Sequence, residues 1–157
     1  MHVLIYRDEK MNFEFHTDTY PSLESHDSNG RLHKQETYPS GKGIEKTEVG
    51  EVVNEHGDTE SPTFSFSNRS RKLFFVTDFL EPPGKIKYHT VFVALDTEKW
   101  IDKEIFRLEN QEMIEDSNRI TTQLQNSSDW PSGLYRYDIY LEGNLAQSTE
   151  FSFSKET

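Results

Sequence analysis

The sequence predicts an all-β protein in which the C-terminal part, residues 63–153, forms an antiparallel β-sandwich. Three observations lead to this fold class. Short runs with strand character recur at regular spacing after Pro62 and are separated by turn residues. Aromatic residues make up 13% of the chain, with 11 Phe and 7 Tyr, and such side chains favour strands. The last two runs are joined by Glu142-Gly143-Asn144, whose chemistry suits a hairpin turn.

Seven strands are predicted in this region, at residues 63–67, 73–79, 86–95, 103–108, 119–124, 134–141 and 145–153. Residues 109–116 are predicted to form a turn or a single helical turn. The run 134–141 alternates clearly, and alternation places every second side chain on one face of a strand. We therefore expect a buried face made of Tyr135, Tyr137, Ile139 and Leu141.

The first sixty residues give a different pattern. Residues 3–6 and 13–16 are strand-like runs separated by a polar stretch, which predicts a hairpin within an N-terminal strand pair, residues 1–19. Residues 20–62 are rich in Pro, Ser, Gly, Asn and charged residues, and a chain of this composition offsets the entropy of ordering poorly. We interpret them as a polar, acidic linker or long loop, with a short strand at residues 48–53, and residues 63–157 as the sandwich domain.

The run Asp129-Trp130-Pro131-Ser132-Gly133-Leu134-Tyr135-Arg136-Tyr137 and the following turn at Gly143 resemble the closing hairpin of bacterial immunoglobulin-like domains. The resemblance covers about residues 63–153 and implies an immunoglobulin-like sandwich. It implies structural roles for Trp130 and Pro131 at one end of the sandwich, and for Gly133 and Gly143. It also makes Tyr135 a corner residue whose hydroxyl bonds to the preceding backbone, and it places Tyr137 where related domains carry a disulfide Cys. Aromatic packing then has to hold the two sheets together, and the resemblance is silent on activity.

Charge and composition restrict the function classes. The formal net charge of −11 disfavours direct binding to nucleic acid, because the phosphate backbone is repelled. The chain has no Cys, which excludes disulfides, thiolate nucleophiles and Cys-based metal centres. The apolar run at the N-terminus is shorter than that of a secretory signal, and no segment is long enough to span a bilayer. We expect a cytoplasmic protein, although a secreted or periplasmic one with its signal removed stays open.

Few residues suggest chemistry. Glu14, His16 and Asp18 would share one face of a strand and are the candidate metal ligands, although no spacing typical of a zinc or iron site accompanies them. No nucleophile elbow or phosphate-binding loop is found. The triplets Asn68-Arg69-Ser70 and Asn126-Ser127-Ser128 match the glycosylation pattern, and we interpret them as ordinary loop residues.

Trp100 and Ile101 are the candidate binding residues, since a Trp in polar surroundings is typical of protein interfaces. The sequence thus favours a non-enzymatic module that binds a protein partner and needs no cofactor. One alternative is an acidic inhibitor that occupies the basic nucleic-acid-binding surface of a partner. A second alternative is a metal-dependent enzyme that uses the His- and acid-rich N-terminal region.

Overall fold

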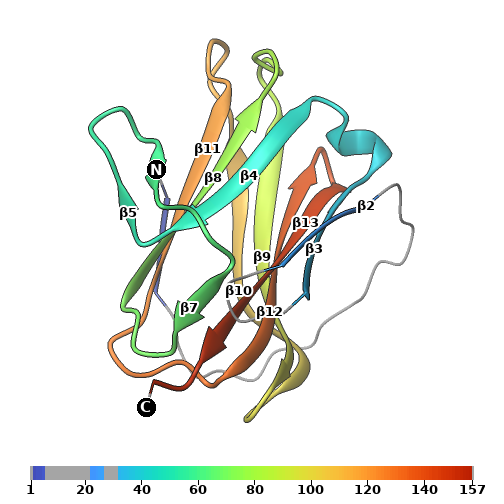
Figure 1. The fold of residues 1–157 in the computed structure, drawn as a ribbon. Helices are drawn as coiled ribbons and strands as arrows, with labels where there is room; N and C mark the ends of the chain where they lie inside the picture. Colours follow the sequence, from blue (N-terminus) through green and yellow to red (C-terminus); the bar gives the residue numbers. More distant parts are fainter. Residues whose placement is uncertain (1, 6–21, 27–31, 157) are drawn as a thin grey trace.

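The computed structural model describes residues 2–5, 22–26 and 32–156, and these residues form an all-β protein (Figure 1). A four-stranded sheet has the order β1-β11-β8-β4 and a seven-stranded sheet has the order β10-β9-β12-β13-β3-β2, with β7 beside β13. Most pairs are antiparallel, whereas β1 with β11 and β7 with β13 are parallel. The all-β, sandwich-like fold class predicted from the sequence is confirmed.

The bounds of the strands in the smaller sheet are His2–Ile5 (β1), Ile44–Gly50 (β4), Lys72–Phe79 (β8) and Arg119–Gln125 (β11). The larger sheet contains Ser22–His26 (β2), Leu32–Thr37 (β3), Ser65–Ser67 (β7), Lys87–Thr97 (β9), Ile101–Glu112 (β10), Gly133–Leu141 (β12) and Asn144–Ser154 (β13). Val52–Val53 (β5) and Thr59–Glu60 (β6) form a separate hairpin, and Pro39–Gly41 is a short 3₁₀ turn, η1. None of the described residues belongs to a helix long and apolar enough to cross a membrane.

Aromatic side chains fill the space between the two sheets. Phe75 of β8 lies 4.7 Å from the ring centre of Tyr137 and 5.0 Å from those of Phe92 and Phe151, which belong to the larger sheet. All four side chains are buried. Because large aromatic side chains bury much apolar area, these four residues contribute a large part of the apolar surface that is buried between the sheets.

The closing hairpin has the geometry that its sequence predicts. β12 pairs with β13 from Gly133 opposite Phe153 to Leu141 opposite Asn144. Glu142 and Gly143 form the turn with φ of 49° and 82°, and Gly143 adopts this positive φ without strain because it has no Cβ. The buried face of β12 contains Tyr135, Tyr137, Ile139 and Leu141, as the alternation indicates.

The sequence underestimates the length of β10. The predicted strand at residues 103–108 extends to Ile101–Glu112 and so includes half of the predicted turn at 109–116. Irregular pairing with β9 between Glu104 and Phe106, and again between Leu108 and Gln111, interrupts the alternation. Each bulge moves the following side chains to the other face, which hides the strand from a period-two pattern.

The interpretation of residues 20–62 as a linker is wrong for the described part of that segment. β4 pairs with β8 along its length, and Ile44 and Val49 belong to the main core. Polar side chains occupy other interior positions: the Thr47 hydroxyl is buried and hydrogen-bonds to the Thr77 hydroxyl, 2.7 Å away, and to the Gln147 carbonyl oxygen. A buried polar group that is fully bonded is compatible with a core, although it looks like a loop residue in the sequence.

The N-terminal strand also belongs to the sandwich. Residues predicted as the first strand of a hairpin form β1, whose described partner is β11 of the smaller sheet. The second run of that predicted hairpin, residues 13–16, lies outside the described residues. The described chain is therefore one sandwich, without the predicted boundary near residue 62.

Candidate functional site

Trp130 closes one end of the core. Its side chain is buried, its indole N–H donates to the Ser70 carbonyl over 3.0 Å, and its ring stacks on Phe153 with ring centres 4.9 Å apart. The Tyr135 hydroxyl donates to the Pro131 carbonyl over 2.5 Å, which is the hydrogen bond expected of a corner tyrosine. Both side chains thus hold the loop before β12 against the body of the sandwich.

Tyr137 links the two sheets. Its hydroxyl lies 3.0 Å from the Thr122 hydroxyl of β11, and its ring packs on Phe75 of β8. Burial raises the pKa of the Tyr137 hydroxyl well above its ordinary value. Tyr137 therefore stays neutral and acts as a structural contact between the sheets.

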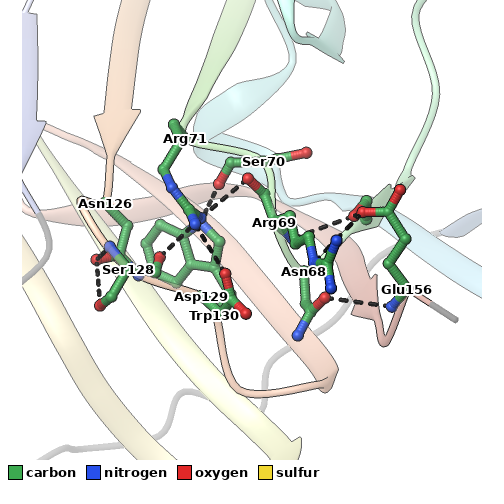
Figure 2. A network of polar contacts seen from close by, with 10 residues as sticks. Asn68, Arg69, Ser70, Arg71, Asn126, Ser128, Asp129, Trp130 and Glu156 are labelled. Atoms are coloured by element: carbon green, nitrogen blue, oxygen red, sulfur yellow. Dashed lines mark hydrogen bonds and ion pairs between the residues drawn. The ribbon is translucent and has the colours of Figure 1, made fainter.

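A polar network surrounds this same end of the molecule (Figure 2). The Arg71 guanidinium donates to the carbonyls of Arg69 and Ser128 and pairs with the Asp129 carboxylate at 2.8 Å. It joins the loop before β8 to the loop after β11. Nearby, the Asn68 side-chain oxygen accepts the Glu156 backbone N–H and so holds the C-terminal residues.

The two glycosylation triplets lie in these loops. The side chains of Asn68 and Asn126 are buried, and their oxygens accept backbone N–H groups. The structure thus gives both residues a role in holding the loops.

Trp100 is not the exposed contact residue that the sequence suggests. Its side chain is only 7% exposed and belongs to the main core. The backbone N–H of Trp100 donates to the Thr97 hydroxyl over 2.8 Å, in the tight turn between β9 and β10. The ammonium groups of Lys99 and Lys103 lie 4.9 and 4.8 Å from its ring centre. The neighbouring Ile101 does point outward and is 73% exposed.

The predicted metal ligands Glu14, His16 and Asp18 lie outside the described residues, so their arrangement stays a prediction. Among residues 2–5, 22–26 and 32–156, no group of three or more His, Asp or Glu side chains is placed to hold a metal ion.

Ion pairs also lie on the face of the larger sheet that points away from the core. The Arg136 guanidinium pairs with both carboxylate oxygens of Asp138 at 2.8 and 2.9 Å, and both residues are buried. On β10, the Glu104 carboxylate accepts two hydrogen bonds from Arg107 and raises the pKa of that guanidinium. These pairs bring opposite charges together within single strands, and we assign them a structural role.

An apolar pocket of about 580 Å³ opens at the other end of the sandwich. It lies between η1 and β4, the loop from β8 to β9, and the hairpin from β12 to β13, at the end toward which the β8 arrow points in Figure 1. This volume is within the range of about 300–1,000 Å³ that is usual for binding pockets. The apolar side chains that line it are Phe79, Leu80, Pro82, Pro83, Ile86 and Leu141.

Hydrogen bonds between the three segments fix the walls of the pocket. The Leu80 N–H donates to the Gly43 carbonyl over 2.9 Å, which holds the β8–β9 loop against β4. The Glu142 carboxylate accepts the Lys87 N–H over 2.9 Å, and the Glu142 N–H donates to the Lys87 carbonyl over 2.8 Å. Leu80 itself is 66% exposed, so the pocket presents a large apolar side chain to solvent.

The sequence does not reveal this pocket, because its walls come from residues 40–43, 79–86 and 141–144. One local signal was available. Leu80 directly follows a buried strand and precedes Glu81-Pro82-Pro83-Gly84, so an apolar residue stands where the chain enters a turn.

No family model and no curated protein matches the chain. One similar solved structure is the soluble domain of PmoD from Methylocystis sp. ATCC 49242 (Rockwell), with a TM-score of 0.44 and 8% identity over 86% of this chain and 96% of that chain. A likeness of this size supports no statement about function, and the resemblance to bacterial immunoglobulin-like domains stays a prediction.

Proposed function

We propose that this protein is a non-enzymatic binding module that contacts a protein partner at the pocket end of the sandwich. The observation that carries the proposal is the apolar pocket with the exposed Leu80 at its edge. Interfaces are commonly centred on a few apolar anchors that fill pockets, so this end of the molecule has the shape that such an anchor needs.

The position of the pocket supports this proposal. Its walls are loops and hairpin turns at the ends of strands, and a rigid sandwich that presents loops is a frequent binding architecture. Ile114, in the loop between β10 and β11, is 73% exposed at the same end. The Met113 N–H donates to the Ile86 carbonyl over 2.9 Å, so this second loop lies directly beside the pocket wall.

The proposed contact surface does not include Trp100 and Ile101, the binding residues that the sequence favoured. Ile101 is as exposed as Leu80, but it follows the β9–β10 turn at the opposite end of the strands. The two residues therefore form a matched pair of exposed aliphatic side chains, one at each end of the sandwich.

Site-specific photocrosslinking in the organism of origin tests the proposal. A benzophenone amino acid replaces Leu80 in one form of the full chain and Ile101 in the other. We expect the form labelled at position 80 to crosslink to a discrete protein partner, and the form labelled at position 101 to give no such product. A partner captured only from position 101, or from neither position, would contradict the proposed contact surface.

A further inference from the structure

Resting on the proposed function, we infer that the partner offers the pocket an apolar side chain flanked by lysine or arginine residues. The pocket explains the apolar part of this motif. The charged part of the motif follows from exposed carboxylates around the pocket that form no ion pair within the described part of the chain.

Exposed carboxylates gather on and directly beside the two loops at this end. One loop joins β8 to β9 and the other joins β10 to β11, and the Phe79 N–H donates to the Asn118 carbonyl over 2.8 Å, which keeps the two loops together. None of these carboxylates forms an ion pair within the described part of the chain. They are Glu81, Glu112, Glu115 and Asp116.

At the opposite end of the sandwich, three acidic residues are paired with cations of the chain. Asp129 pairs with Arg71 at 2.8 Å, Glu98 pairs with Lys155 at 3.1 Å, and Glu156 lies 3.8 Å from Arg69. Cations of the chain thus neutralise these three carboxylates, whereas Glu81, Glu112, Glu115 and Asp116 near the pocket keep their negative charge available for a partner.

Lysines are also present near the pocket, and they are fewer. Lys42 lines the pocket, and Lys85 and Lys87 lie on or beside the β8–β9 loop. With Glu142 included, five carboxylates stand against three lysines, in a chain of net charge −11. Complementary charge steers association and fixes which partner binds, so a basic flank is favoured and an acidic one is repelled.

Three labelled peptides test the inference by fluorescence anisotropy with the full chain. Each contains Leu-Phe as the apolar anchor, flanked on both sides by two lysines, two serines or two glutamates. We expect the lysine-flanked peptide to bind about tenfold more tightly than the serine-flanked one at low salt, and the glutamate-flanked peptide to bind most weakly. Raising the salt from about 50 to about 500 mM should remove most of this difference, because exposed charges are screened.

A charge-matched pair of variants locates the effect. The combination of Glu81→Gln, Glu115→Gln and Asp116→Asn neutralises the pocket end and should reduce the preference for lysine to less than about threefold. The control combination of Glu51→Gln, Asp96→Asn and Asp102→Asn removes the same charge from exposed positions away from the pocket and should leave the preference unchanged.

The possible failures are distinguishable. Equal affinities for the three peptides, with binding still lost in Leu80→Ser, would overturn the basic flank and leave the proposed contact surface standing. A preference for the glutamate-flanked peptide, or an equal effect of the control combination, would also overturn the inference. If no peptide binds, the basic flank is rejected, and the crosslinking result decides separately on the contact surface.

Discussion

At the residue scale, two buried aromatic side chains hold backbone that would otherwise be free to move. The Tyr135 hydroxyl and the Trp130 indole N–H donate to the carbonyls of Pro131 and Ser70, which lie in the loops beside β12 and β8. Buried polar groups that lose a partner cost more than an average hydrogen bond contributes. The hydroxyl of Tyr135 and the indole N–H of Trp130 therefore contribute to the stability of the fold in addition to the apolar parts of these side chains.

Tyr135→Phe should lower the free energy of unfolding by about 1–3 kcal/mol, because it leaves the Pro131 carbonyl without its donor. Urea denaturation monitored by circular dichroism measures this change. A loss of only a few tenths of a kcal/mol, on the order of an exposed substitution, would show that the hydroxyl is satisfied by water.

Trp100→Ala should destabilise the protein by about 3–5 kcal/mol, the usual cost of truncating a buried Trp. Ile101→Ala is the adjacent control and should change the stability by less than about 0.5 kcal/mol, since its side chain is exposed. Thermal unfolding of both variants checks the pair. A Trp100→Ala variant as stable as Ile101→Ala would mean that the indole lies at the surface, as the sequence first suggested.

At the element scale, the sequence predicts strands well where aromatic and β-branched residues alternate, as in β8, β9, β12 and β13. The sequence predicts strands poorly where a buried position holds a polar side chain or where the alternation of apolar residues is interrupted. In β4 the interior position of Thr47 is filled by a hydrogen-bonded hydroxyl, and in β10 two bulges shift the pattern. A buried polar side chain finds its hydrogen-bond partners on strands that are distant in the sequence. No local sequence pattern could therefore have indicated that it is buried.

Substitution by Ala should destabilise the protein to different extents at the two glycines of the closing hairpin. A Cβ on Gly133 would lie 2.2 Å from the Asp96 carbonyl oxygen and 2.5 Å from the Thr97 Cα, whereas a Cβ on Gly143 would meet nothing within 4 Å. Both residues have positive φ, so both substitutions strain the backbone.

Gly143→Ala should therefore cost about 1–2 kcal/mol from backbone strain alone. Gly133→Ala should cost at least about 2 kcal/mol more, because β9 and β12 have to separate to admit the methyl group. Chemical denaturation of the two variants gives the comparison. Equal losses would indicate that the neighbouring strands yield without cost at Gly133.

At the scale of the whole molecule, segments far apart in the sequence combine to make both the core and the pocket. β4 supplies Ile44 and Val49 to the main core, and β3 extends the larger sheet beyond β13. The same strands frame the η1 turn, whose Ser40 hydroxyl donates to the Leu145 carbonyl over 2.6 Å beside the pocket. The candidate site could not be predicted from the sequence because it depends on this long-range arrangement.

A chain that begins at Ser61 should fail to fold cooperatively, although the sequence pattern alone suggested an independent domain there. It lacks β4, which covers one edge of β8, and it removes buried side chains from the core. Thermal unfolding followed by circular dichroism should show no sharp transition for this fragment and a cooperative one for the full chain. A cooperative transition in the fragment would restore the boundary near residue 62.

The central claim, that the pocket end contacts a partner, is tested most directly by affinities for the protein crosslinked from position 80. Leu80→Ser and Ile101→Ser each remove one exposed aliphatic side chain, at opposite ends of the sandwich. Isothermal titration calorimetry should show a loss of at least about tenfold, or 1.4 kcal/mol, for Leu80→Ser and less than about twofold for Ile101→Ser. Unchanged affinity in Leu80→Ser, or the larger loss in Ile101→Ser, would contradict the account.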